Sequence, residues 1–305
     1  MTVTANLVKD LREKTGAGMM DCKKALTETN GDLEAAVDWL RKKGIATASK
    51  KSGRVAAEGK VVVAAAGQRG VLLEVNTETD FTAKNEKFIA YANTAVETAL
   101  ANGVDALETL AAAPYPGAGR SVAEELTALI ASIGENMNLR RLTSLTVTRG
   151  VVVGYSHMAG KIGTLVGLES DASDQEALRE LGKKIAMHVA ASTPFYLNRE
   201  QVPAADLERE KSVLAEQARA SGKPEAIIEK MVLGRLSKFY GDTCLVEQPF
   251  VMDQEQTVQA VVDATAKQLG SGITVSGFAR FMMGEGLQKR DDDFAAEVAK
   301  QVGGQ

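Results

Sequence analysis

The order strand, turn, strand, helix occurs twice along this chain, and no other feature limits the possible fold as strongly. Four segments rich in β-branched and other apolar residues predict the strands, namely residues 60–66, 71–76, 151–157 and 161–169. A glycine-containing turn joins the strands of each pair, which is typical of a β-hairpin, and apolar residues at helical spacing follow each hairpin. The repetition indicates two related subdomains side by side. The predicted fold class is therefore α+β.

The boundaries of the subdomains follow from segments of different composition around them. We assign residues 56–148 to the first subdomain, and residues 149–205 together with 247–290 to the second. Residues 206–246 interrupt the second subdomain with two polar helical patterns around a turn at 221–224, which predicts an inserted antiparallel helical hairpin. Because such a polar hairpin buries little by itself, its apolar stripe is expected to meet another surface or its own domain.

Residues 1–55 predict a separate module of three short helices. Met20, Cys22 and Ala25 are expected in its core, and Asp32 is expected to cap the third helix. A core of this size gives little stability by itself.

The segments beside these modules leave alternatives open. Residues 41–60 are basic and lack large apolar side chains, so we interpret them as a mobile linker. A nucleic-acid-binding arm is the alternative, although no aromatic residue is interleaved for stacking on bases. Residues 291–305 predict an amphipathic helix whose acidic first turn suits the helix dipole, either as a fraying tail or as a docking helix.

Charge and rare residue types argue against several classes of function. The net charge of −4 and a pI of about 5.5 provide no overall positive field for nucleic acid. Two distant cysteines and two histidines do not match a disulfide framework or a metal motif. We therefore predict no catalytic residues, no metal and no cofactor. No apolar run is long enough to span a membrane and no signal peptide precedes Met1, so a cytoplasmic protein with reduced thiols is expected.

The segment NTETDF at residues 76–81 lies between a predicted strand and a predicted helix, a position where binding residues often occur. Asp80 is suited to cap the following helix. Phe81 either folds back as a hydrophobic staple or points outward as an anchor for a pocket in another protein. The local sequence does not decide between these two orientations.

This segment, together with Ala83-Lys84, resembles the TDF loop of the elongation factor Ts family. The pattern TGAGMMDCKKAL at residues 15–26 resembles that family's ubiquitin-associated-like N-terminal domain. The resemblance covers essentially the whole chain, although residues 101–119 match poorly. Further segments that resemble the family, including its protruding coiled coil, are residues 30–32, 206–246, 248–253 and 284–298.

The resemblance implies a guanine-nucleotide exchange factor for the GTPase elongation factor Tu, with no chemistry of its own. In that mechanism Phe81 and Asp80 disturb the magnesium and phosphate site, so that GDP leaves and GTP can bind. The resemblance also implies that the helical hairpin supports a homodimer or a partner contact. For His188, a buried core position is the alternative. The residues implied at the surface for elongation factor Tu are Thr79, Asp80, Phe81, Lys23, Ile133, Gly134, His157, His188, Val251 and Met252.

Overall fold

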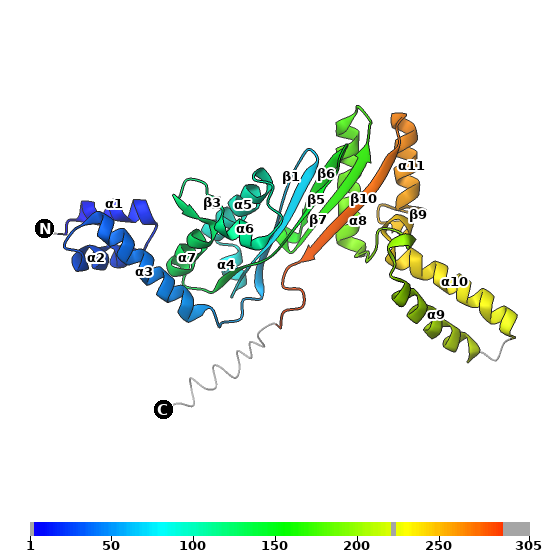
Figure 1. Cartoon of the computed structure of the whole chain (residues 1–305), viewed down its shortest axis with the longest axis horizontal. Coiled ribbons are helices and arrows are strands. Elements are labelled where there is room, and N and C mark those ends of the chain that lie inside the picture. Colours follow the sequence, from blue (N-terminus) through cyan, green and yellow to red (C-terminus); the bar gives the residue numbers. More distant parts are fainter. Residues whose placement is uncertain (1–2, 221–223, 289–305) are drawn as a thin grey trace.

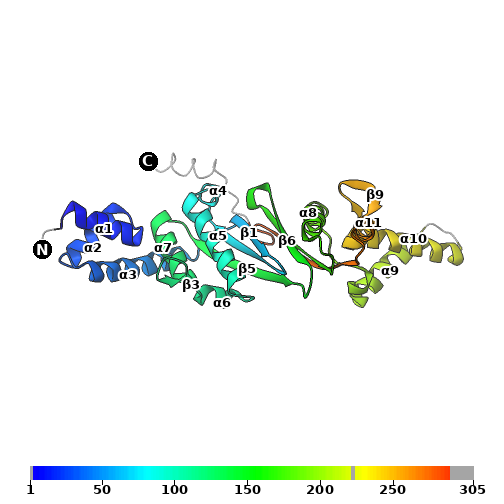
Figure 2. The same cartoon turned by 90° about the horizontal axis from the view of Figure 1, so that it is seen from above.

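The structure is a computed structural model that describes residues 3–220 and 224–288. The molecule is elongated, with a helical module at one end, two antiparallel sheets in the middle and a helical hairpin at the other end (Figure 1 and Figure 2). This architecture confirms the predicted α+β class. The predicted helix at residues 291–305 lies outside the described residues. Within the described ranges, no helix is long and apolar enough to cross a membrane.

Three helices form the N-terminal module, namely α1 (Ala5–Thr15), α2 (Met19–Glu28) and α3 (Leu33–Lys51). Cys22 and Ala25 are buried between them and the side chain of Asp32 caps α3, as predicted. Leu26 is buried in the same core. The prediction that Met20 belongs to this core is wrong. Met20 is 74% exposed because it lies on the outer face of α2.

The basic segment is a helix over much of its length, so the expectation of a mobile linker is wrong there. Helix α3 continues to Lys51 and packs against α7 (Val122–Ile133). A Cβ atom added at Gly44 would lie 3.6 Å from the Cβ of Ala131, and Ala48 packs against the core of the first subdomain. The small side chains that suggested a linker instead allow two helices to approach closely.

The first subdomain contains a three-stranded antiparallel sheet in the order β1-β2-β5. Its strands are β1 (Glu58–Ala66), β2 (Arg69–Thr77) and β5 (Met137–Thr146). Helix α5 packs on this sheet, where Phe88 and Tyr91 are buried in one cluster with Val62 and Leu73. The remaining elements are α4 (Asp80–Ala83), α5 (Glu86–Ala101), α6 (Leu107–Ala112), β3 (Pro114–Tyr115), β4 (Arg120–Ser121) and α7.

The second subdomain repeats this plan with a sheet in the order β10-β7-β6. Its strands are β6 (Val151–His157), β7 (Ile162–Ser170) and β10 (Ile273–Met282). Helix α8 (Gln175–Ser192) packs on β6 and β7, and α11 (Val258–Leu269) packs on β10. Short elements complete the subdomain: η1 (Met158–Gly160), η2 (Arg199–Gln201), η3 (Leu245–Glu247), β8 (Pro249–Phe250) and β9 (Asp253–Thr257).

The helical hairpin consists of α9 (Ala204–Arg219) and α10 (Glu225–Thr243), which lie side by side and project from the second subdomain (Figure 1). Leu214, Ala218, Ile228 and Leu236 are its buried residues. The predicted apolar stripe is therefore used at least in part between the two helices. Other apolar side chains remain exposed on the hairpin, namely Val213, Ile227 and Leu233.

The two sheets pack face to face, and glycines make the close approach possible. A Cβ atom at Gly154 would lie 2.4 Å from Cγ1 of Val63, and one at Gly163 would lie 2.5 Å from Cγ1 of Val61. Both distances are too short for non-bonded carbon atoms, so these positions have no room for a side chain. Strand β1 is consequently buried on both faces, with Val61 toward the second sheet and Val62 toward the helices.

A fully buried carboxylate joins the two subdomains. Glu74 on β2 accepts hydrogen bonds from Arg140 at 2.8 Å and from Arg141 at 2.6 Å, both on β5. It also accepts one from the amide of Gly284, 2.8 Å away in the turn after β10. Burial alone would raise the pKa of Glu74, but these hydrogen bonds outweigh burial and hold the pKa below its usual range.

Candidate functional site

The loop between β2 and α5 places one large aromatic side chain in solvent. Phe81 is 81% exposed, whereas its neighbours Thr82 and Ala83 are buried. The hydroxyl of Thr79 caps the single turn of α4 by accepting a hydrogen bond from the amide of Thr82 at 3.2 Å. The backbone on both sides of Phe81 is therefore anchored while the ring is not. Of the two orientations that the sequence left open, the outward one is observed.

Glu135, just after α7, holds this loop in place. Its Oε2 atom accepts hydrogen bonds from the hydroxyl of Thr77 at 2.9 Å and from the amide of Thr79 at 3.1 Å. Its Oε1 atom accepts one from the hydroxyl of Thr79 at 2.7 Å. Burial alone would raise the pKa of Glu135, but the hydrogen bonds from Thr79, Thr82 and Thr77 keep the pKa below its usual range. The carboxylate is thus charged at neutral pH and acts as a multiple acceptor.

A second carboxylate contact joins the loop to the end of the N-terminal module. The backbone amide of Asn136 donates a hydrogen bond to Glu78 at 2.6 Å. The side-chain amide of Asn136 in turn donates to the carbonyl of Arg54 at 2.7 Å. Lys51, at the end of α3, donates a hydrogen bond to the carbonyl of Gly134. The loop, the end of α7 and the end of α3 therefore meet at residues 134–136.

Asp80 does not cap the helix, which corrects the prediction from the sequence. It is the first residue of α4, and its carboxylate lies 2.7 Å from the ammonium of Lys84 one turn later. The hydrogen bond from Lys84 lowers the pKa of Asp80, and the positive charge of Lys161 adds to this effect. Both charges are solvent-exposed, so this pair contributes little to stability.

The turn after β6 lies on the same edge as the loop, because α4 and η1 both contact β1. Lys161, which follows η1, donates a hydrogen bond to Glu58 of β1 at 2.7 Å. His157 is exposed, and the Tyr155 hydroxyl lies 2.9 Å from its Nδ1 atom. Met158 beside it is 66% exposed. His157 was expected at the surface, whereas Met158, whose positive φ marks a sharp turn, was not among the expected site residues.

Ile133 and Gly134 lie next to the loop, as the expected site requires. Ile133 ends α7 and packs partly against the core, and Gly134 ends the helix with a φ of 90°. Because Glu135 is the next residue and accepts hydrogen bonds from Thr79, these residues and the Phe81 loop are connected within the first subdomain.

His188, Val251 and Met252 form a separate group in the second subdomain. Val251 and Met252 are the exposed tip of the β8–β9 turn, at 41% and 48%. His188 is completely buried below them, so its alternative assignment as a core histidine is the observed one. Its Nε2 atom lies 2.9 Å from Oε1 of Gln248. Desolvation lowers the pKa of His188, although the hydrogen bond with Gln248 opposes this effect.

Lys23 is exposed on α2, at the far end of the molecule from the β8–β9 turn (Figure 1). Met19 and Met20 on the same helix are 60% and 74% exposed. The expected site residues thus fall into three surfaces rather than one. Their spread along the molecule fits contact with a large partner better than capture of a small ligand.

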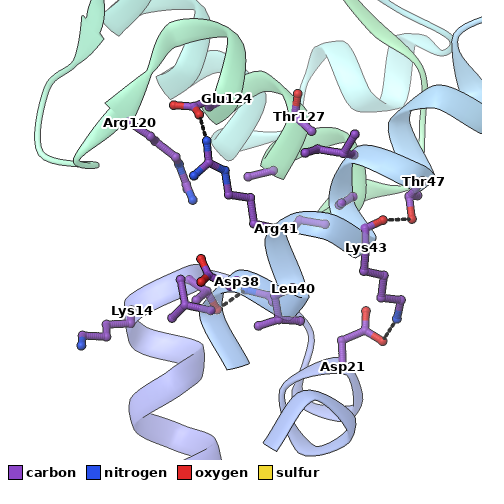
Figure 3. Close-up of a pocket in the computed structure, with 18 of the residues that line it drawn as sticks. Lys14, Asp21, Asp38, Leu40, Arg41, Lys43, Thr47, Arg120, Glu124 and Thr127 are labelled. Carbon is purple, nitrogen blue, oxygen red and sulfur yellow. Dashed lines mark hydrogen bonds and ion pairs between the residues drawn. The ribbon is translucent and has the colours of Figure 1, made fainter. Parts of the chain in front are cut away.

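A cleft of about 360 Å³ lies between the N-terminal module and α7, beside the contact of α3 with α7 (Figure 3). Two ion pairs lie among its lining residues, Arg41 with Glu124 across the cleft and Lys43 with Asp21 within the module. None of the expected site residues lines it. Among the described residues, no cluster of His, Cys, Asp and Glu is arranged to hold a metal ion.

Comparison with known proteins shows to which class of protein this chain belongs. The family model described as Elongation factor TS matches residues 78–285, which include the Phe81 loop, Glu135 and the β8–β9 turn. The chain is therefore a protein of the translation elongation factor class.

Full-length relatives agree with this match. Elongation factor Ts of Magnetococcus marinus is 62% identical over 304 residues and covers 100% of both chains. Those of Paramagnetospirillum magneticum and Rhodospirillum centenum are 56% and 57% identical over 306 residues, with 99% of this chain and 97% and 99% of the relatives covered. The chain belongs to the elongation factor Ts family.

Proposed function

We propose that this protein is the guanine-nucleotide exchange factor of elongation factor Tu. It binds the GDP form, disturbs the magnesium and phosphate site, and promotes GDP release so that GTP can bind. The observation that carries the proposal is the Phe81 ring, which is 81% exposed on a loop whose backbone is fixed on both sides. Such a rigid, exposed aromatic is suited to enter a pocket of another protein, because little conformational entropy is lost on binding.

The physical basis of exchange is linkage between two binding equilibria. Suppose that the exchange factor binds the nucleotide-free GTPase more tightly than the GDP form. It must then weaken the affinity of the GTPase for GDP by the same ratio. The factor therefore needs contacts that compete with the magnesium and phosphate contacts of GDP. It needs no catalytic residue for this, and we propose that the protein is not an enzyme and uses no cofactor or metal of its own.

Phe81 and Asp80 are proposed to act together at the GTPase. The ring enters near the elements that hold the magnesium ion, and the carboxylate of Asp80 perturbs the groups around the ion. Mg²⁺ is held in GTPases mainly by water, phosphate and few side chains, so a small displacement weakens its coordination. Loss of the cation leaves the diphosphate charge uncompensated, and GDP dissociates faster.

The other surfaces are proposed to provide binding energy rather than exchange. Thr79, Ile133, Gly134 and His157 lie around the Phe81 loop and extend its contact area. Val251 and Met252 offer an exposed apolar tip in the second subdomain. His188 supports that tip from below rather than touching the partner.

Lys23 is proposed to contact the GTPase domain through the N-terminal module, with Met19 and Met20 beside it. The C-terminal segment 291–305 remains a proposed additional contact.

The helical hairpin exposes Val213, Ile227 and Leu233, and self-association through these residues is proposed as a second role. Sedimentation velocity with Leu233→Glu tests that role, because a dimer formed elsewhere would be unaffected. We propose a cytoplasmic location, without direct contact to nucleic acid or a membrane.

The direct test is release of labelled GDP from elongation factor Tu. Addition of this protein in sub-stoichiometric amounts is expected to accelerate release, because an exchange factor turns over. If the rate of GDP release stays at its spontaneous value at every concentration of the protein, the proposal is refuted.

A further inference from the structure

We propose that Glu135 is a positioning residue for nucleotide exchange, which sets the direction in which the Phe81 ring leaves the surface. This inference rests on the proposed function. It concerns a residue that lies outside the loop, 56 positions from Thr79 in sequence, and that does not need to touch the partner.

The Phe81 ring cannot orient itself. At 81% exposure the Phe81 side chain has few contacts with its own protein. Its direction therefore depends on the backbone of α4, a helix of only four residues. A helix this short has no independent stability, so its orientation must be fixed by the packing of its buried residues Thr82 and Ala83 and by the hydrogen bonds at its N-terminal end.

Glu135 provides contacts at the N-terminal end of α4. Three hydrogen bonds of 2.7–3.1 Å run from Thr77 and Thr79 to the two carboxylate oxygens. Thr79 is also the N-cap of α4. The same hydroxyl that caps the helix is thus held by Glu135, which couples the carboxylate directly to the axis of α4.

Glu135 lies where several segments of the first subdomain meet. It follows Ile133 and Gly134, and the next residue, Asn136, holds Glu78 and Arg54. Two proposed contact regions and the end of the N-terminal module are therefore tied at one point. A misplacement of about 1 Å at a distant support can lower a rate by about two orders of magnitude.

We expect the maximal rate of exchange and the half-saturating concentration to respond differently when Glu135 is replaced. Glu135→Ala removes all three hydrogen bonds, and the maximal rate of GDP release at saturating factor should fall about tenfold, equivalent to about 1.4 kcal/mol. The factor concentration at half-maximal rate should change by less than about threefold, because the surfaces that provide affinity remain. Amide hydrogen exchange at Thr79 should accelerate at the same time, because its acceptor is lost.

Two further variants separate positioning from general damage. Glu135→Gln keeps one carbonyl oxygen for the Thr79 amide, so it should recover part of the maximal rate; it also replaces Glu135→Ala if that variant does not fold. Glu125→Ala is the matched control, because Glu125 lies on α7 and pairs with Arg120 away from the loop. This control should leave both kinetic parameters unchanged.

The outcomes also distinguish the two proposals. A full maximal rate with Glu135→Ala, or a change in half-saturation alone, would overturn the positioning role and leave the proposed function intact. Failure of the wild-type protein to accelerate GDP release would overturn the proposed function itself.

Discussion

The backbone amide of Val251 donates a hydrogen bond of 3.1 Å to Nδ1 of the completely buried His188. This contact links an exposed turn to the core of the second subdomain, and it requires an unprotonated Nδ1 atom. The other ring nitrogen, Nε2, faces Oε1 of Gln248. The neutral imidazole can therefore donate a hydrogen bond to Gln248 through Nε2 and accept one from Val251 at Nδ1. The conformation of the β8–β9 turn therefore depends on the protonation state of a residue that solvent does not reach.

His188 should make the stability of the protein depend on pH. Its folded pKa lies below the ordinary value of 6.5, mainly because of burial. The unfolded chain therefore binds more protons in the window below 6.5, and stability falls as the pH falls through that value, by at most about 1.4 kcal/mol per pH unit. Urea denaturation from pH 8 to pH 5 measures this, and His188→Gln should reduce the slope. Equal slopes in the two proteins would contradict the assignment.

Gly154 should not tolerate even a methyl group. An added Cβ would lie 2.4 Å from Cγ1 of Val63, so the two sheets must move apart. We expect Gly154→Ala to lower the free energy of unfolding by about 1–3 kcal/mol. Gly53→Ala is the control, because no atom lies within 4 Å of the added carbon there. Equal stability of the two variants in urea denaturation would show that the sheets are not packed as described.

Met20 and Leu26 should respond differently to the same substitution. Met20 is 74% exposed and Leu26 is fully buried, although both lie on α2. Met20→Ser should change the stability of the N-terminal module by less than about 0.5 kcal/mol, whereas Leu26→Ser should cost about 2–5 kcal/mol. Fluorescence of Trp39, the single tryptophan and part of this module, reports its unfolding. A large effect of Met20→Ser would place that side chain back in the core.

Local patterns predicted much of the fold. Runs of β-branched residues, such as 61–63 in the first hairpin, and the turns between strands predicted both hairpins, because these signals need only neighbouring residues. The packing of the two sheets was not predicted. It depends on Gly154 and Gly163 facing valines about a hundred positions away, and a glycine in a strand does not indicate what approaches it.

For the site, too, local signals were predictable and contacts between residues distant in sequence were not. Phe81 was identified from its segment, but its outward orientation was left open because the loop is held by long-range contacts, such as the hydrogen bond from Thr79 to Glu135, that the local sequence does not contain. Asp80 was expected to cap the helix after the loop, but Asn85 caps that helix, because the separate turn α4, capped by Thr79, precedes it. Met20 was placed in the core because a methionine at helical spacing gives no information on which face is covered.

The central claim is that the exposed ring of Phe81 accelerates GDP release from elongation factor Tu. The most direct measurement is the maximal rate of labelled-GDP release with wild-type protein, Phe81→Ala and the control Phe195→Ala, which removes a ring that is 71% exposed and lies outside the proposed contact surfaces. We expect Phe81→Ala to lower this rate at least about tenfold, with an unchanged unfolding transition, and Phe195→Ala to retain it. A wild-type rate with Phe81→Ala would contradict the account.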